Sequence, residues 1–265
     1  MSLVVIPLGL LIGTVLGALG GGGAILTVPV LVYALGQDPR TATTSSLLIV
    51  GTTSLLALAP HACAGHVRFG HGLLFGALGA AGSFAGSAAS TAVPPQVLLT
   101  AFAALLLAVA VSMLRRSADA SQNTSPRPSS GSPAPWSLAQ VLRLLTAATA
   151  VGAFTGFFGV GGGFLLVPAL VLVLGYRMPV AVGTSLLVIS LNSATALIAR
   201  MLGATGVGSL DWALIGGFTG AAVLGSLLGA RVSAHANPAH LTRAFAALLL
   251  LVAFYTATRS VPALL

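Results

Sequence analysis

The stretch Gly17-Ala-Leu-Gly-Gly-Gly-Gly-Ala-Ile-Leu-Thr-Val-Pro29 decides the fold, because a run of glycines there interrupts a long apolar segment. It returns as Gly156-Phe-Phe-Gly-Val-Gly-Gly-Gly-Phe-Leu-Leu-Val-Pro168, with corresponding residues 139 positions apart (156 − 17 = 139). Non-helical backbone at membrane depth must be buried in protein or line a cavity. Two glycine-interrupted apolar segments at matching places therefore predict a repeated membrane architecture with a binding site at the breaks.

The composition is that of a membrane protein. Of 265 residues, 57% are hydrophobic and 5% are charged, whereas soluble domains carry roughly 25% charged residues. The chain has neither Lys nor Glu, which excludes a Walker A loop and a His-Glu-x-x-His zinc site. The net charge of +8 comes from scattered arginines, a pattern that argues against nucleic-acid binding. We predict no metal, no cofactor and no enzymatic activity.

The apolar segments fall into two homologous halves. Residues 1–116 form a first transmembrane repeat, residues 137–265 a second, and the Ser- and Pro-rich residues 117–136 a flexible linker. Each repeat has a glycine-broken first helix and three further apolar segments. We predict an all-α membrane protein with eight long segments, or ten when the broken halves are counted separately. The offset of 139 is expected to continue into the Gly-rich third helix of each repeat, where it lays Gly86 over Gly225.

The arginines constrain the topology, because Lys and Arg collect on the cytoplasmic side of a membrane. If each repeat crosses five times, eight arginines share one side, and three face the other, namely Arg40, Arg200 and Arg259. If each repeat crosses four times, the split is seven against four. Both counts place the linker in the cytoplasm. The odd count has the stronger asymmetry and makes the two repeats inverted, an arrangement common in secondary transporters.

The glycine breaks are the first candidate for an anion site. If they lie near the midplane, the helices that begin there present free N–H groups and a partial positive charge to a ligand. The alternative is that the glycines only allow close helix packing. The candidate glycines are Gly20, Gly21, Gly22, Gly23, Gly161, Gly162 and Gly163.

Polar side chains after the breaks are the second candidate. Hydroxyl and amide groups can donate hydrogen bonds to an anion from a neutral wall, although a helical Ser or Thr often bonds a carbonyl one turn away instead. His61 and Arg200 correspond at the offset of 139, and ionisable residues inside a membrane segment suggest function. The alternative is that both snorkel to the interface. The neutral candidates are Thr44, Ser45, Ser46, Thr184, Ser185 and Asn192.

These motifs resemble those of the TauE/SafE family of sulfite and organosulfonate exporters. The resemblance rests on the doubled Gly-x-x-Gly-x-Gly-Gly motif and on the related stretches Ala42–Leu47 and Ala181–Leu186. It implies a multi-pass secondary transporter in the inner cell membrane that exports a small sulfur-containing anion. The expected partners are that anion and the lipid bilayer, with a homodimer as a further expectation. The alternative is a passive anion channel of the same architecture, which would conduct faster and show no counterflow.

Overall fold

The structure is a computed structural model that describes residues 4–90, 95–122, 138–158, 163–202 and 210–260. Within these ranges the chain is helical and contains no strand, which confirms the predicted all-α class. The first repeat contains α1 (Val5–Leu19), α2 (Gly22–Pro29), the π-helical turn η1 (Val30–Ala34), α3 (Pro39–Cys63), α4 (Phe69–Ser90) and α5 (Pro95–Gln122). The second contains α6 (Leu138–Phe158), α7 (Gly163–Leu172), α8 (Met178–Leu202), α9 (Trp212–His235) and α10 (Pro238–Ser260).

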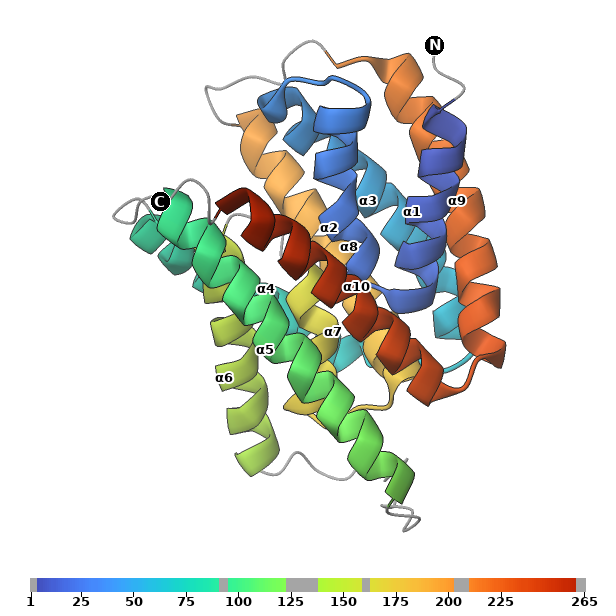
Figure 1. Ribbon diagram of the computed structural model, residues 1–265. Coiled ribbons are helices and arrows are strands. Elements are labelled where there is room, and N and C mark those ends of the chain that lie inside the picture. The colour runs from blue at the N-terminus through green and yellow to red at the C-terminus, as the bar shows by residue number, and fades with distance from the viewer. Residues whose placement is uncertain (1–3, 91–94, 123–137, 159–162, 203–209, 261–265) are drawn as a thin grey trace.

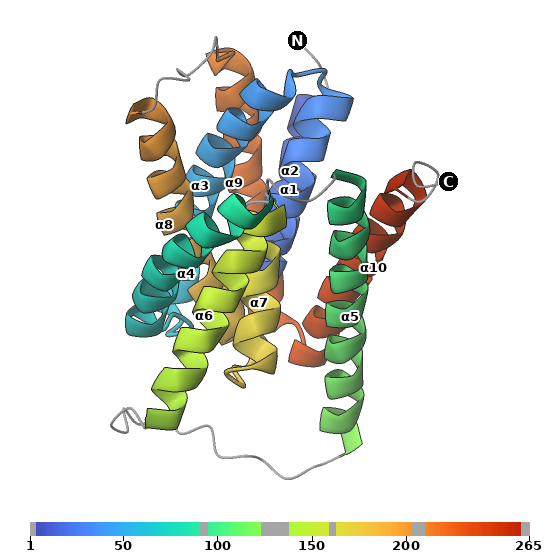
Figure 2. The same ribbon diagram turned by 90° about the vertical axis from the view of Figure 1, so that its left-hand side faces the viewer.

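Each repeat opens with two helices that fold back on one another. Gly20 ends α1 with a φ of 69°, a conformation that glycine adopts without steric cost. α2 then returns along α1, so that Gly23 faces Leu16 (Figure 1). α7 likewise descends beside the ascending α6 (Figure 2). The predicted broken helix is therefore a helical hairpin, and its 15-residue first arm is about 22 Å long, too short to cross the ~30 Å hydrocarbon core.

The helices pack in pairs that are related by exchange of the two repeats. α1 lies along α9 and α6 lies along α4, while α3 crosses α8 and the hairpin helices α2 and α7 meet each other. The last helices, α5 and α10, run side by side (Figure 1). α1 runs downward from the N-terminus, whereas α6 runs upward from the linker (Figure 2). The first helices of the two halves, α1 and α6, therefore run in opposite directions.

Small residues set the separation of the two closest helix pairs. A side chain on Gly17 of α1 would overlap the backbone of Ser226 in α9, and one on Gly156 of α6 would overlap the backbone of Ser83 in α4. In lipid, where apolar surface gives no hydrophobic drive for helix association, such close backbone contact stabilises helix pairs through van der Waals packing. Both repeats use the same contact.

These contacts correct the alignment of the fourth helices. Because Gly17 and Gly156 correspond, their partners Ser226 and Ser83 also correspond, and they are 143 positions apart (226 − 83 = 143). The expectation that Gly86 corresponds to Gly225 is therefore wrong by one helical turn. The physical reason is that the connection from α8 to α9 is four residues longer than that from α3 to α4.

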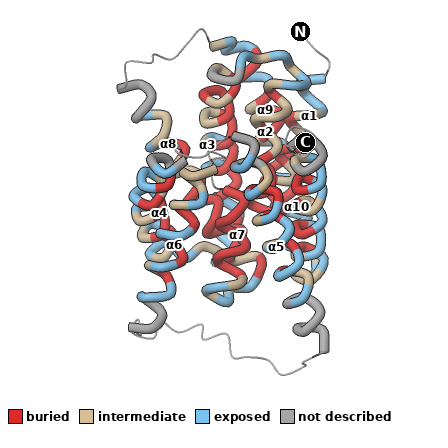
Figure 3. The backbone as a smooth tube through the Cα atoms, turned by 60° about the vertical axis from the view of Figure 1, so that its left-hand side comes forward, coloured by how far each residue is buried: buried red, intermediate tan, exposed pale blue. Residues whose placement is uncertain are grey.

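The surface and the interior fit a membrane protein that crosses more than once. Among the described residues, four helical segments are long and apolar enough to span a bilayer: Thr41–Cys63, Met178–Ile198, Trp212–Ala234 and Pro238–Thr256. The buried residues gather around α7, which is buried from Gly163 to Val171 (Figure 3). Large apolar side chains, including Phe84, Leu224 and Phe254, are exposed on the outside. The outer face can therefore meet lipid.

Candidate functional site

The predicted glycine breaks of the two repeats meet inside the protein. Gly21 lies against the backbone of Gly163, and Gly20 lies against Ser185 and Val167. All four glycines from Gly20 to Gly23 are buried, as is Gly163. Gly161 and Gly162 lie outside the described residues. A side chain at Gly21 would overlap the Gly163 carbonyl, so this glycine allows close packing, and its predicted role in binding an anion stays a prediction.

The hydroxyl clusters flank this contact, and some of their hydroxyl groups form hydrogen bonds whereas another does not. Ser46 donates through Oγ to the Thr43 carbonyl at 2.8 Å, and its counterpart Ser185 donates to the Val182 carbonyl at 2.8 Å. These two hydroxyls are therefore satisfied within their own helices, as is common for helical serine. Thr44 and Ser45 are also buried, and the Ser45 hydroxyl has no partner among the described residues.

The start of α8 is tied to the connection between α3 and α4. Thr184 accepts a hydrogen bond from the Arg68 backbone N–H at 3.1 Å. Tyr176, in the connection between α7 and α8, packs edge-on against His71 with ring centroids 6.0 Å apart. Burial raises the pKa of Tyr176, and the nearby Arg68 charge acts in the opposite direction. Tyr176 is therefore a neutral phenol at physiological pH.

His61 holds the end of α3 against the tip of the first hairpin. Its side chain is 4% exposed, and Nε2 lies 3.2 Å from the Gly17 carbonyl oxygen. Because a carbonyl oxygen can only accept, Nε2 carries the proton and donates. Arg200 lies in α8, but its side chain is outside the described residues. The pairing of His61 with Arg200 around an anion thus stays a prediction.

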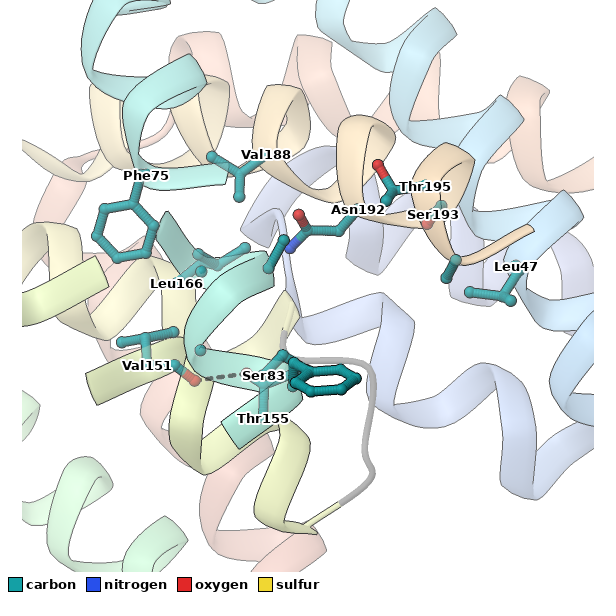
Figure 4. Close-up of a pocket in the computed structure, with 15 residues that line it drawn as sticks. Leu47, Phe75, Ser83, Val151, Thr155, Leu166, Val188, Asn192, Ser193 and Thr195 are labelled. Atoms are coloured by element: carbon teal, nitrogen blue, oxygen red, sulfur yellow. Dashed lines mark hydrogen bonds between the residues drawn. The ribbon is translucent and has the colours of Figure 1, made fainter. Parts of the chain in front are cut away.

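A cavity of about 430 Å³ lies beside the packed breaks, between α4, α6 and α8 (Figure 4). Leu166 of α7 lines it, whereas the next residue, Val167, packs against Gly20. α7 therefore separates the cavity from the glycine contact. Phe84 of α4 also lines the cavity and is 83% exposed, so that one end of the cavity reaches the outer surface of the helix bundle.

Among the residues that the structure describes, those that line this cavity include neutral polar groups and no charged ones. Asn192 reaches from α8 toward the space beside α4 and α7 (Figure 4), and its carboxamide has no hydrogen-bond partner among the described residues. Thr155 of α6 donates to the Val151 carbonyl at 2.7 Å, and Thr195 of α8 donates to the Leu191 carbonyl at 2.9 Å. The amide of Asn192 is therefore a polar group in the wall that is free to bind a ligand.

Of the residues predicted from the sequence, Asn192 alone lines the cavity among those described. The other polar lining residues, Ser83, Thr155, Thr195 and Ser193, come from three helices. Their approach depends on how α4, α6 and α8 pack, and no local motif marks it. Ser193 directly follows Asn192 in the sequence. These two adjacent polar residues in an apolar helix are the signal that could have identified Ser193.

Comparison with known proteins identifies the family of this chain. The family described as "Sulfite exporter TauE/SafE" matches residues 5–256. A "Probable membrane transporter protein" of Xylella fastidiosa (strain 9a5c) is 36% identical over 270 residues, which cover 97% of this chain and 95% of the relative. The "Probable membrane transporter protein YunE" of Bacillus subtilis (strain 168) is 29% identical over 248 residues, covering 88% of this chain and 89% of the relative. No solved structure matches. With its helices, its spans and this match in agreement, the chain belongs to the sulfite exporter TauE/SafE family of multi-pass membrane transporters.

Proposed function

We propose that this protein is a secondary transporter that exports sulfite or an organosulfonate through the cavity between α4, α6 and α8. The observation that carries the proposal is this cavity, with a volume of about 430 Å³ and the unpaired Asn192 amide in its wall. Ligand pockets typically measure ~300–1,000 Å³ and hold a few placed polar groups among apolar ones. The family description and the names of the relatives support the same class of activity.

Neutral hydrogen-bond donors in the described part of the wall suit a carrier of anions. Amide and hydroxyl donors can replace part of the water around a sulfonate or sulfite oxygen. A site that conducts must bind strongly enough to admit the ion and weakly enough to release it. The membrane potential can drive release outward, because a monoanion leaving a negative-inside cell gains ~2.3 kcal/mol per 100 mV.

In the proposed orientation, the linker lies in the cytoplasm. The two repeats, residues 1–116 and 137–265, lie in the inner membrane and are inverted relative to each other. The opposite directions of α1 and α6 support it (Figure 2). Each hairpin enters and leaves on the same side, so that three crossings per repeat give the same odd parity as five. The split of eight arginines against three is therefore unchanged, and the richer side is the cytoplasmic side.

In this proposal the packed residues support the site and do not line it. The contact of Gly21 with Gly163 fixes the two hairpin tips against each other. His61 joins α3 to the first tip through the Gly17 carbonyl. These contacts give the cavity a rigid floor, since α7 lies between them and Asn192.

The test is flux of sulfite, methanesulfonate, sulfate and chloride into proteoliposomes of the purified protein. We expect saturable methanesulfonate or sulfite flux with trans-stimulation, reduced about tenfold or more by Asn192→Leu, because a hydrogen bond to a charged group is lost. Thr195→Val is the matched control: it lies on the same helix and wall, but its hydroxyl is bonded to the Leu191 carbonyl. Fast flux without trans-stimulation would indicate a channel. Wild-type flux in Asn192→Leu would show that the cavity is not the path.

A further inference from the structure

The cavity has a counterpart in the other repeat. Exchange of the repeats maps α8 onto α3, α6 onto α1 and α4 onto α9. The offset of 139 places Thr53 at the position of Asn192 and Ser54 at that of Ser193, and the offset of 143 places Ser226 at that of Ser83. The region between α1, α3 and α9 is therefore the equivalent of the open cavity.

This counterpart region is closely packed. Thr53 is 1% exposed and Ser54 and Ser226 are 0% exposed. A large apolar residue, Leu16 of α1, stands at the position of Thr155 of the cavity wall and is also buried. The two equivalent regions thus differ in whether space is present, although both carry polar side chains at the equivalent α3 and α8 positions.

The hydroxyls of Thr53 and Ser54 have no hydrogen-bond partner among the described residues. Their neighbours in the same region do have partners: Thr27 donates to the Gly23 carbonyl at 3.1 Å and Ser226 donates to the Val223 carbonyl at 2.8 Å. A buried hydroxyl without a partner is destabilising. Two adjacent ones, at the positions equivalent to Asn192 and Ser193, point to a ligand that this conformation does not admit.

We propose that Thr53 and Ser54 form a second contact site for the same small oxyanion, closed in this structure, which opens between α1, α3 and α9 when the cavity between α4, α6 and α8 closes. The inference rests on the proposed function, because it makes the two regions the alternate openings of one carrier. The first helices of the two repeats run in opposite directions (Figure 2). When the open and the packed arrangement are exchanged between the two regions, the opening therefore faces the opposite side of the membrane.

The first experiment removes one hydroxyl without changing side-chain shape. In proteoliposomes, Thr53→Val should raise the KM for methanesulfonate about tenfold or more at one membrane face, because a hydrogen bond to the anion is lost. Its melting temperature should be equal to that of the parent or higher, since an unpaired buried hydroxyl is removed. Ser233→Ala is the matched control, because Ser233 is also buried and unpaired but lies in α9 rather than in α3. An unchanged KM at both faces in Thr53→Val would overturn the proposal.

The second experiment does not depend on the substrate. In a Cys63→Ser background, Thr53→Cys should react with a membrane-impermeant maleimide added at one face, and Asn192→Cys should react at the other. Ser233→Cys should stay unreactive. If Thr53→Cys is as unreactive as Ser233→Cys, the second opening does not exist. If both cysteines react as expected while no sulfur anion is transported, the second opening stands and the proposed substrate fails.

Discussion

The region between α4, α6 and α8 and the region between α9, α1 and α3 are built from corresponding helices, yet the first contains the cavity and the second buries its polar side chains at the equivalent positions. The two regions differ in the size of the side chains at equivalent positions. Gly79 lines the cavity, whereas its counterpart Ala222 is buried against Phe218 in a small apolar cluster. The comparison teaches that one set of helix pairings accommodates both an open and a packed arrangement.

Each region is bounded on one side by a close helix pair, α1 with α9 or α6 with α4, which we call a seam. Gly17 against Ser226 and Gly156 against Ser83 form the same backbone contact in each repeat. The two seams are alike, but the third helix packs on them differently: α3 packs against both α9 and α1, whereas α8 packs mainly against α4. We therefore expect each seam to behave as a rigid unit and the third helix to move.

The largest effect should come from breaking a seam. Gly17→Leu and Gly156→Leu each place a side chain on the backbone of the facing helix, and overpacking of this kind costs about 3 kcal/mol or more. Both variants should lose the monodisperse peak in detergent, measured by size-exclusion chromatography. Gly216→Leu in α9 is the control, because nothing lies within 4 Å of its Cβ position. Loss of only one seam variant would show that the two repeats are not equivalent.

The next effect should come from charge in the open region. Asn192→Asp preserves shape but places a carboxylate in the cavity wall, and two like charges 4 Å apart repel by ~4 kcal/mol at an effective dielectric constant of ~20. Methanesulfonate flux should fall about 100-fold or more, beyond the loss in Asn192→Leu, with an unchanged melting temperature. A flux equal to that of Asn192→Leu would mean that the anion does not approach this side chain.

A smaller effect should separate the open region from the packed one. Gly79→Ala adds a methyl group whose nearest atom is the Ala148 carbonyl oxygen at 3.9 Å, so the helix propensity gain of up to ~1 kcal/mol is kept. Ala222→Gly removes a buried methyl group and loses a similar amount. The melting temperature should rise in the first variant and fall in the second. Two shifts of the same sign would remove the distinction between the regions.

The smallest effect concerns the connections before α8 and α3, where Tyr176 corresponds to Gln37. The pKa of Tyr176 is raised by burial, so the folded state holds the phenol proton more tightly than the unfolded state. This contribution is complete below pH ~10 and is lost as pH rises through the folded-state pKa. Tyr176→Phe should lessen the fall in melting temperature above pH ~10. An equal fall in parent and variant would exclude this contribution.

Sequence patterns predicted the all-helical class and the repetition, and they named Asn192 as a candidate binding residue, which the structure places in the cavity wall. They did not predict the hairpins, because a glycine run breaks a helix without fixing the direction in which the chain continues. The four-residue shift was visible in principle: Ala-Phe-Ala-Ala-Leu-Leu-Leu occurs at residues 101–107 and again at 244–250, 143 positions apart. The sequence left Gly20 and Gly21 open to two interpretations; the contact of Gly21 with Gly163 shows close packing, and anion binding stays a prediction.

The sequence by itself determined that this chain is a repeated helical membrane protein, because apolar length, scarce charge and glycine spacing are local properties that the bilayer selects. It also placed polar side chains at equivalent positions of both repeats. Only the tertiary structure decided which of the two regions is open. Asn192 and Thr53 are both polar residues at equivalent positions, but one lines a cavity and the other is buried. The physical reason is that the space beside them depends on the distance between helices far apart in the sequence.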